Sequence, residues 1–358
     1  MITRKVPLTM MEAFELILQL DISDITFNFR LILSVSKNLY NGRIRLFKNN
    51  KRKRMYNICC VGHITLDKVV TPNASLKMAG GTSFYFSNAI RNMDVSYILI
   101  TSLAKKEMTF VADLRNNGVE VNAFNCSHTV YFENIYSQDS DHRIQRVLQT
   151  ADAFSFEQMK HIEASLFHLG PLLADDIPLE LIKALSKKGK VSLDVQGYLR
   201  KVQNQDVYPV DWKDKKEGLQ YVDILKANET EMEMLVGFKD IHKGAKMLND
   251  WGVKEVVITS GSKGSLIYAD SVFYDIPVYK PTAEIDTTGC GDTYMAGYLY
   301  KRIRNATIQE AGEFGAAMAS LKIESPGPFT GTEADVLKLL ANNKLSEHPV
   351  GSGLKIPQ

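Results

Sequence analysis

The residues DTTGCGDTY, at positions 286–294, place two glycines and a carboxylate directly before a long apolar run. Gly289 and Gly291 lack a Cβ, so their backbone amides can approach an anion closely. Asp292 would project from the first turn of the following helix, where unpaired N–H groups and the positive end of the helix dipole collect. An acid placed there can take a proton from a hydroxyl while the amides stabilise a transferred phosphoryl group. Taken alone, the pattern favours a plain turn with an acid at the helix start.

Such a turn needs a scaffold, and from residue 55 onward strand-like and helix-like segments alternate. This alternation predicts an α/β fold with a mostly parallel sheet covered by helices on both faces. Ligands in such folds bind at the carboxyl ends of the strands. The expected strands are 57–61, 96–102, 165–169, 190–194, 223–226, 255–259 and 265–268, and the expected helices are 84–93, 107–117, 178–188, 229–236, 240–251, 291–303 and 307–323.

The region 119–150 has a different pattern. The stretches TVYFENIYS and IQRVLQT alternate polar and apolar residues around the polar turn QDSDHR. Alternation of period two is typical of half-buried strands. We expect this region to form part of a small antiparallel lid.

Composition and charge narrow the possible partners. The chain has 358 residues, 45% hydrophobic and 23% charged, with a net charge of +2. Residues 1–54 hold 11 basic and 4 acidic side chains, whereas the remainder holds 32 basic and 37 acidic ones. The main body therefore lacks the basic surface typical of nucleic-acid binding. Charges interrupt the apolar stretches near the N-terminus, and no secretory signal is evident, so no membrane association is expected.

Four cysteines, at positions 59, 60, 126 and 290, show neither C-x-x-C spacing nor the density of a disulfide scaffold. They indicate reduced thiols in a cytoplasmic protein. Residues 1–54 differ from the body and are expected to be an extension outside the fold, or alternatively a basic arm for an anionic partner. Residues 55–342 are expected to form one domain, followed by a tail at 343–358.

The stretch DTTGCGDTYMAG closely resembles the C-terminal signature of the ribokinase-like (PfkB) carbohydrate kinase family, and the resemblance extends over roughly residues 56–340. It implies a three-layer α/β/α fold with a small β lid. It also implies that Asp292 is the catalytic base and that Gly289, Cys290 and Gly291 form the anion hole. Cysteine replaces the more usual alanine, which backbone amides would tolerate. In many members, the stretch at Asp286 and Thr287 borders a monovalent cation such as K⁺.

Two further stretches resemble the family's acceptor-binding elements. GHITLD resembles a Gly-x-x-x-x-Asp element whose acid binds substrate hydroxyls, which nominates Asp67. AGGTSFYFSNA resembles the sugar-binding turn, with Gly80 and Gly81 close to the substrate. Many sugar kinases carry Asn four residues after the second glycine, whereas this chain has Tyr85. A phenol in place of an amide disfavours a ribose-type or fructose-type substrate.

The donor side is represented by two stretches. KANETEMEMLVG resembles the family's Asn-x-x-Glu element, so Asn228 and Glu231 are expected to organise Mg²⁺, largely through water. The same residues are typical of an N-capped helix, and both roles can hold together. VVITSGSKGSLIY resembles the nucleotide-binding strand and turn. The residues nearest ATP would be Thr259, Gly261, Lys263 and Gly264.

The stretch SLDVQGYLRK departs from the family's Asp-x-Asn-x-Arg pattern, because Gln196 replaces the Asn and Arg200 lies two residues later. The resemblance places Asp194 and Gln196 toward the active site and Arg200 near a phosphate. Together with Tyr85 and TVYFENIYS, this variant resembles the branch of the family that acts on nucleosides or on cyclic polyols such as inositol.

These features predict a kinase that transfers the γ-phosphate of ATP to a hydroxyl of a sugar or cyclic polyol, with Mg²⁺ and in many relatives K⁺. A lid at about 67–85 and 119–148 would close over the site, and its strands could pair in a homodimer. The alternatives are a nucleoside kinase of the same family and a catalytically idle, sugar-sensing regulator. A Rossmann-type dehydrogenase would need a glycine fingerprint after the first strand, and VGHITLD has one glycine.

Overall fold

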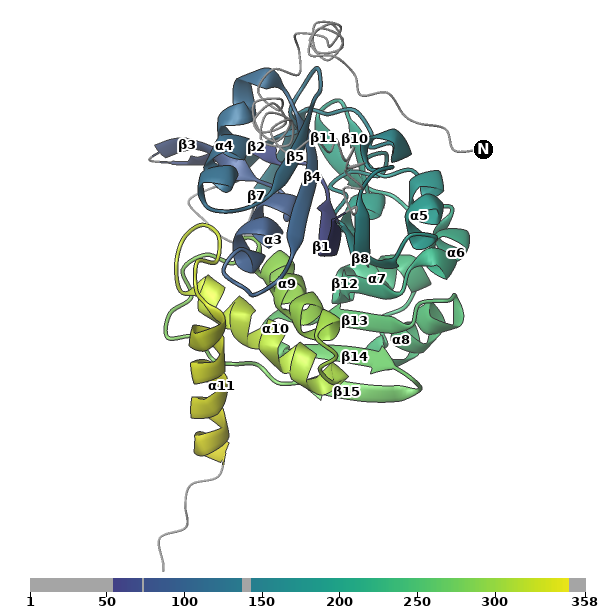
Figure 1. Cartoon of the computed structure of the whole chain (residues 1–358), viewed down its shortest axis with the longest axis vertical. Coiled ribbons are helices and arrows are strands. Elements are labelled where there is room, and N and C mark those ends of the chain that lie inside the picture. The colour runs from purple at the N-terminus through teal and green to yellow at the C-terminus, as the bar shows by residue number, and fades with distance from the viewer. Residues whose placement is uncertain (1–53, 73, 137–142, 348–358) are drawn as a thin grey trace, which may run out of the picture. The chain divides into compact units, whose positions relative to one another are not determined.

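The computed structural model of the chain describes residues 54–72, 74–136 and 143–347. The expected extension, apart from Arg54, and most of the expected tail therefore lie outside the described residues. A large sheet and a smaller second sheet make up the strand structure, and helices cover the large one (Figure 1).

The large sheet has nine strands in the order β15-β14-β13-β12-β9-β8-β1-β4-β5. Every neighbouring pair from β13 to β5 is parallel, whereas β14 and β15 pair antiparallel at one edge. The mostly parallel α/β architecture expected from the alternating segments is confirmed. The strands are β1 (Met55–Val61), β4 (Tyr97–Leu103), β5 (Val121–Asn125), β8 (Glu163–Leu169), β9 (Lys190–Asp194), β12 (Ile224–Asn228), β13 (Glu255–Thr259), β14 (Ser265–Ala269) and β15 (Val272–Ile276).

Strand β1 shows why these strands are apolar along their whole length. Ile58 and Cys60 face one hydrophobic core, and Cys59 and Val61 face the other. Side chains of a strand point alternately to the two faces of a sheet, so a strand covered on both faces must be apolar at every position. The unbroken run ICCV therefore places β1 in the middle of the layers, where all four side chains are fully buried.

Helices cover both faces of the sheet (Figure 1). One face packs against α3 (Thr82–Ile90), α4 (Met108–Asn116), α9 (Cys290–Ile303), α10 (Ile308–Ile323) and α11 (Glu333–Glu347). The other packs against α5 (Leu179–Ser186), α7 (Glu229–Val236) and α8 (Ile241–Asp250), with the short α6 (Lys215–Gly218) beside α5. No helix within the described ranges is both long and apolar enough to cross a membrane.

The starts of two helices follow directly from local sequence signals. Asn228 and Glu231 form a reciprocal capping box at α7, and Thr307 and Glu310 form another at α10. Each box satisfies backbone N–H groups that the first turn of a helix leaves without partners. Gly237, with φ of 86°, ends α7 in the left-handed conformation that glycine adopts without strain.

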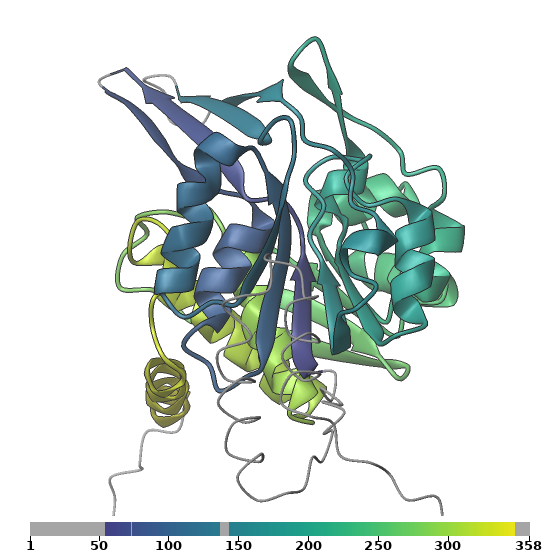
Figure 2. The same ribbon diagram turned by 45° about the horizontal axis from the view of Figure 1, so that its top comes forward.

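The second sheet has six strands in the order β10-β11-β7-β6-β2-β3. It stands beyond the end of the large sheet at which the parallel strands finish (Figure 2), because β2 follows the carboxyl end of β1 and β10 follows that of β9. Its strands are β2 (Thr65–Thr71), β3 (Ala74–Gly80), β6 (Tyr131–Tyr136), β7 (Arg143–Gln149), β10 (Arg200–Gln203) and β11 (Asp206–Pro209).

The second sheet differs from the expected lid in four respects. Residues 121–125 form β5, which pairs in parallel with β4 in the large sheet and does not belong to the lid. Residues 82–85 begin α3, the helix that packs on the large sheet through Phe86, Ala89 and Ile90. The lid is also not wholly antiparallel, because β2 and β6 run parallel, and the β10–β11 hairpin joins it from a distant part of the sequence.

Candidate active site

The glycine turn at residues 289–291 begins α9, as its sequence predicts. Gly289 is the N-cap residue with φ of 74°, a conformation that residues with a Cβ rarely adopt. A Cβ on Gly289 would lie 2.2 Å from Cδ1 of Tyr85, so the ring and the turn are in close contact. The Cys290 amide donates to the Thr287 carbonyl over 3.3 Å. The other amides in the first turn of α9 have no acceptor within the helix and are available to an anion.

Asp292 lies in the first turn of α9, close to residues from three other segments. Its carboxylate hydrogen bonds with the hydroxyl of Thr82 at the start of α3, and Gln196 Nε2 donates to that same hydroxyl over 2.8 Å. Burial raises the pKa of Asp292 to about 7, the Asp194 carboxylate adds to the rise, and Lys226, Thr82 and Arg200 oppose it. A carboxylate with a pKa near neutrality is suited to exchanging a proton with a substrate hydroxyl.

Lys226, on β12, is a residue of this site that sequence reasoning missed. Its Nζ lies 2.9 Å from Oδ2 of Asp194 and 3.9 Å from Oε2 of Glu231, and all three side chains are almost completely buried. A Cβ on Gly291 would lie 3.2 Å from the same Nζ, so the ammonium lies against the glycine turn. Burial lowers the pKa of Lys226, but Asp194 and Glu231 more than offset this and hold it above its usual range.

A signal for Lys226 was present in the sequence. It is the one charged residue in the strand ILKA, and lysines are almost never fully buried unless they are paired. Because Lys226 stays protonated, it supplies a fixed positive charge between the acids and the glycine turn.

The predicted acceptor residues meet at the corner where β2, β3 and α3 join. Thr65 Oγ1 donates to Oδ1 of Asp67 over 2.6 Å, and Thr65 pairs with Gly80 across the hairpin. A Cβ on Gly80 would lie 2.2 Å from Oδ2 of Asp67, so the glycine makes room for this carboxylate. Gly81, with φ of 90°, is the N-cap of α3. The structure thus brings Asp67, Gly80 and Gly81 together.

Tyr85 has a different environment from the other predicted acceptor residues. Its side chain is 3% exposed, because the ring packs against Gly289 where α3 and α9 meet. The Tyr85 ring thus supports the backbone of the glycine turn at Gly289. The contact between Tyr85 and Gly289 was not predicted from the sequence.

Asn228 and Glu231 use their side chains in the capping box of α7. Asn228 Oδ1 accepts from the Glu231 amide and Glu231 Oε2 accepts from the Asn228 amide, each over 2.8 Å. Burial raises the pKa of Glu231, although the Lys226 charge lowers it. Within the described residues, no group of three or more His, Cys, Asp and Glu side chains is arranged to hold a metal ion. A metal held here through water remains compatible with this arrangement.

Arg200 begins β10 and lies close to this pair. It lines a cavity of about 300 Å³ together with Gln196, Asn228 and Glu231. Its positive charge also lowers the pKa values of Glu231 and Asp292. The three stretches that contain Asp194, Asn228 and Asp292 therefore converge on one site, as the sequence predicts.

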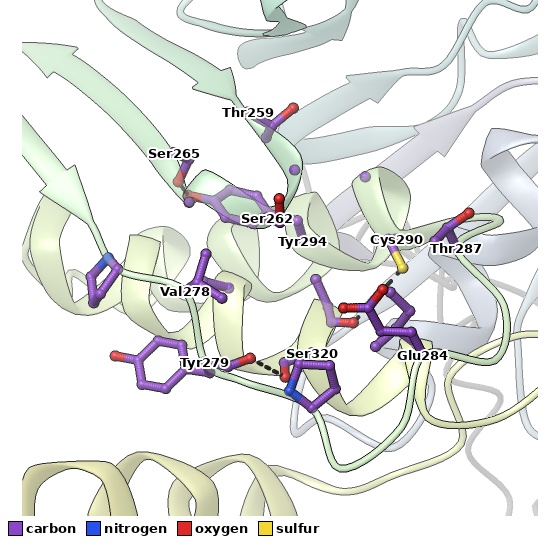
Figure 3. A pocket seen from close by; sticks show the side chains of 18 residues that line it. Thr259, Ser262, Ser265, Val278, Tyr279, Glu284, Thr287, Cys290, Tyr294 and Ser320 are labelled. Carbon is purple, nitrogen blue, oxygen red and sulfur yellow. Dashed lines mark hydrogen bonds between the residues drawn. The ribbon is translucent and has the colours of Figure 1, made fainter. Parts of the chain in front are cut away.

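A second cavity, of about 400 Å³, borders the glycine turn (Figure 3). Thr259 and Ser265 lie on one side of it, and Tyr279 and Ser320 lie on the other. The lining comes from the end of β13, the turn after it, the segment 277–284, the start of α9 and one face of α10. These residues are Thr259, Gly261, Ser262, Gly264, Ser265, Pro277, Val278, Tyr279, Pro281, Glu284, Thr287, Cys290, Gly291, Tyr294, Ala316, Ala319, Ser320 and Ile323.

Three of the four residues predicted for the nucleotide turn line this cavity: Thr259, Gly261 and Gly264. Lys263 does not, because its side chain is 75% exposed and its Nζ lies 3.8 Å from Oε1 of Glu229. The wall formed by residues 277–281 and by α10 was missed. Small residues spaced along GAAMAS on α10 were the available signal, because they leave room beside a helix.

All four cysteines lie in the described part of the chain and are free thiols. Burial raises the pKa of Cys290 to about 11, and its Sγ contacts the Ala319 carbonyl of α10 at 3.8 Å. A thiol in this state is a poor nucleophile. Cys290 therefore contributes its backbone to the glycine turn, and its side chain packs against α10.

The fold, the glycine turn and Asp292 are the features of a phosphoryl-transferring enzyme. Comparisons with known proteins agree with this class. Residues 97–335 match the pfkB family carbohydrate kinase model. The chain therefore belongs to the PfkB family of carbohydrate kinases. It is a kinase, a phosphotransferase with an alcohol group as acceptor.

Several relatives resemble most of the chain. A cytidine kinase of Thermococcus kodakarensis is 26% identical over 296 residues, covering 78% of this chain and 100% of the relative. A pyrophosphate-dependent kinase of the ribokinase family, solved with a pyrophosphate analog and myo-inositol, aligns with a TM-score of 0.71 and 28% identity, covering 78% of this chain and 99% of that one. Arabidopsis thaliana ribokinase, solved with ribose and ATP, shares the fold with a TM-score of 0.67 and 22% identity, covering 80% and 99%.

Proposed function

We propose that this kinase transfers the γ-phosphoryl group of ATP to a hydroxyl of a sugar or cyclic polyol. The observation that carries the proposal is the position of Asp292, a carboxylate with a pKa of about 7 in the first turn of a helix that begins with a glycine turn. The acceptor hydroxyl would lie between Asp292 and the corner formed by Asp67, Gly80 and Gly81. Asp292 takes the hydroxyl proton as the oxygen attacks the phosphorus.

The glycine turn stabilises the charge of the transferred group. The amides of Gly289 and Gly291 would face the phosphoryl oxygens, whereas the Cys290 amide already donates to the Thr287 carbonyl. The Lys226 ammonium lies against Gly291. Bound Mg²⁺ would supply further positive charge to the phosphates, and Asn228 and Glu231 would hold it through water because their side chains already cap α7. Arg200, at the edge of the lid sheet, is placed to contact a phosphate or the acceptor.

The cavity beside the glycine turn favours ATP over pyrophosphate as donor. A volume of about 400 Å³ lies within the range of nucleotide-sized pockets. Its far wall contains Pro277, Val278, Tyr279 and Ala316, which suit the faces of an aromatic base, and none of its lining residues carries a positive charge. A bare diphosphate would gain little from these apolar walls, whereas the base of ATP would be buried against them.

The acceptor class has one competing candidate. Similarity to a cytidine kinase over the whole length of that protein favours a nucleoside, whereas similarity to a kinase solved with myo-inositol favours a cyclic polyol. We place the polyol or sugar first, because the family model that matches residues 97–335 is the carbohydrate kinase model. Closure of the second sheet over the acceptor would exclude water and limit ATP hydrolysis.

The test is donor turnover by the purified protein with Mg²⁺ across sugars, cyclic polyols including myo-inositol, and nucleosides. ATP and pyrophosphate are run in parallel as donors, and Asp292→Asn is the control. A strong response with ATP that disappears in Asp292→Asn while ATP still binds would support the proposal. A response with pyrophosphate alone would overturn the donor assignment. Binding of ATP and of sugars without turnover would favour the idle regulator.

We also propose a homodimer formed through the lid. The edge strand β3 has no neighbour on one side within the described sheet, and Leu76 on it is 60% exposed. Unpaired edge strands are ready templates for a second chain. Light scattering should give a dimer mass for the wild type and a smaller mass for Leu76→Lys, and a monomeric wild type would refute the proposal.

A further inference from the structure

A completely buried lysine lies beside the segment that leads into the glycine turn. Lys322, in the last turn of α10, has 0% side-chain exposure. Its Nζ donates to the backbone carbonyl of Asp286 over 2.6 Å and lies 3.0 Å from Oδ2 of the same residue. Lysine side chains are almost never fully buried without such partners.

Asp286 is itself held from several directions. Its Oδ1 accepts from the Thr288 amide over 2.9 Å, and its Oδ2 accepts from the Gly327 amide over 3.0 Å. Burial raises the pKa of this carboxyl, but these bonds and Lys322 more than offset the effect and leave it lowered. The carboxylate of Asp286 is therefore ionised at neutral pH, and its hydrogen bonds hold it in a fixed orientation.

The segment is also tied to α10 and to the glycine turn through its backbone. The amides of Ile285 and Asp286 both donate to the Ile323 carbonyl, over 2.9 Å and 3.2 Å. At the other end, the Cys290 amide donates to the Thr287 carbonyl over 3.3 Å. Residues 285–288 thus link the end of α10, where Lys322 lies, to the first turn of α9.

The charge of Lys322 reaches that first turn as well. Burial raises the pKa of Cys290, and the positive charge of Lys322 acts against that rise. Asp286 and Cys290 thus both lie within the electrostatic influence of the same ammonium.

These contacts do not fit a monovalent cation at Asp286. K⁺ binds proteins through carbonyl and carboxylate oxygens, with its hydration shell replaced by them. The carbonyl and the carboxylate of Asp286 already bind a positive charge of similar size, supplied by the chain itself. A K⁺ ion at these oxygens would stand next to the Lys322 ammonium and be repelled by it. The sequence-based expectation of K⁺ beside Asp286 therefore does not match the structure.

We propose that the Lys322 ammonium takes the place of an exchangeable cation, holding the segment 285–288 and positioning the amides of the glycine turn, so that turnover is independent of K⁺. The inference rests on the proposed phosphoryl transfer at this turn. Lys322 touches no reacting group, and its role is that of a positioning residue.

The first test measures initial rates of the wild type with MgATP and its best acceptor in chloride salts of K⁺, Na⁺ and tetramethylammonium at equal ionic strength. We expect the rates to agree within about twofold, because no cation enters the site. Activation by K⁺ of about fivefold or more over tetramethylammonium would overturn the proposal.

The second test uses two substitutions that both remove the charge. Lys322→Ala leaves a space beside Asp286 that a small cation can enter, whereas Lys322→Met fills most of the same space with an apolar chain. In tetramethylammonium, both should lose about a hundredfold in kcat, with a much smaller change in the KM for ATP, because misplaced amides weaken the transition state more than the ground state. K⁺ or NH₄⁺ should restore Lys322→Ala and leave Lys322→Met unchanged. Full activity of Lys322→Ala without added cation would refute the positioning role.

A thermal measurement separates this inference from the proposed function. The melting temperature of Lys322→Ala should rise with K⁺ concentration by mass action, whereas those of the wild type and of Lys322→Met should not. This result does not depend on any acceptor, so a protein without turnover would fail the proposed function while the cation replacement could still be confirmed. If Lys322→Ala does not fold, the salt series on the wild type decides, and a K⁺-dependent rise in the wild-type melting temperature would refute the proposal.

Discussion

The pKa of Asp292 sets a specific dependence of turnover on pH. Burial raises that pKa to about 7, and only the ionised carboxylate can accept the hydroxyl proton. Since the pKa is raised, the active form is lost as pH falls through about 7. The ionised fraction is about a half at pH 7, about a tenth at pH 6 and about a hundredth at pH 5. We therefore expect kcat/KM to fall about tenfold for each pH unit below neutrality.

The difficulty is that phosphates of the donor titrate in the same range, with a pKa of about 6 for a phosphate monoester. A substitution that moves the pKa of Asp292 without touching the donor resolves this. Asp194→Asn removes a carboxylate that raises the pKa of Asp292 and leaves Lys226 with one fewer anion to neutralise. Both changes lower the pKa of Asp292. The acid limb of the pH profile, where kcat/KM falls with falling pH, should therefore move to lower pH by about one unit.

The assay is kcat/KM at saturating Mg²⁺ from pH 5 to 9 for the wild type, Asp194→Asn and a matched control. Asp94→Asn is the control, because the side chain of Asp94 is 91% exposed and its carboxylate pairs with Arg304. The limb should move in Asp194→Asn and stay in Asp94→Asn, whatever the absolute rates. A limb at the same pH in all three proteins would assign the titration to the donor and refute Asp292 as the titrating base.

Three further predictions concern stability and the glycine turn. Asp292→Asn should raise the melting temperature at pH 8, because it removes a negative charge that burial destabilises. The gain should shrink as pH falls below 7, where the Asp292 carboxyl of the wild type becomes protonated. A gain that is constant with pH would contradict the raised pKa of Asp292. Gly289→Ala should lower the free energy of unfolding, measured in urea, by about 2 to 5 kcal/mol, since it combines a left-handed backbone with a Cβ 2.2 Å from the Tyr85 ring, and wild-type stability would contradict the contact. Lys226→Met should lower the free energy of unfolding by about 3 to 5 kcal/mol, because the Asp194 carboxylate would remain buried without its partner. A loss below about 1 kcal/mol would contradict the pairing of Lys226 with Asp194.

Much of the scaffold could be predicted from the sequence. All seven expected strands and all seven expected helices are present, with bounds that differ by a few residues at most. The strands were recognisable because burial on both faces requires continuous apolar runs, and the helices because their starts carry caps such as Asn228 and Thr307. Such signals are local, and each is complete within about ten residues.

The missed elements depend on contacts between distant segments. Strand β5 is predicted to belong to the lid because it lies next to the alternating stretches TVYFENIYS and IQRVLQT, yet it pairs with β4 in the large sheet. It is an edge strand of that sheet and most of its residues are only partly buried, so it lacks the continuous buried apolar run of the central strands. The β10–β11 hairpin carries no strong strand signal, and its place in the lid is decided by pairing with β7.

The same distinction applies to the site. Asp67, Gly80, Asn228 and Asp292 could be nominated because the family signature fixes their local spacing, and the structure brings their segments together. Lys226 and Lys322 could not be assigned a role from spacing, because the function of a buried cation depends on which distant oxygens surround it. Lys263 shows the converse, since the family resemblance placed it near ATP, whereas its side chain is 75% exposed and does not line the cavity.

The contact between Tyr85 and Gly289 also bears on how the protein folds during synthesis. Tyr85 belongs to an early helix and Gly289 to a late one, and the lysines that flank the glycine turn come from β12 and α10. The ribosome must therefore release nearly the whole domain before the anion-binding turn can reach its final geometry, whereas β1, β4 and β8 can pair long before then. Affinity for the donor would consequently appear as one of the last events of folding, after most of the sheet has formed.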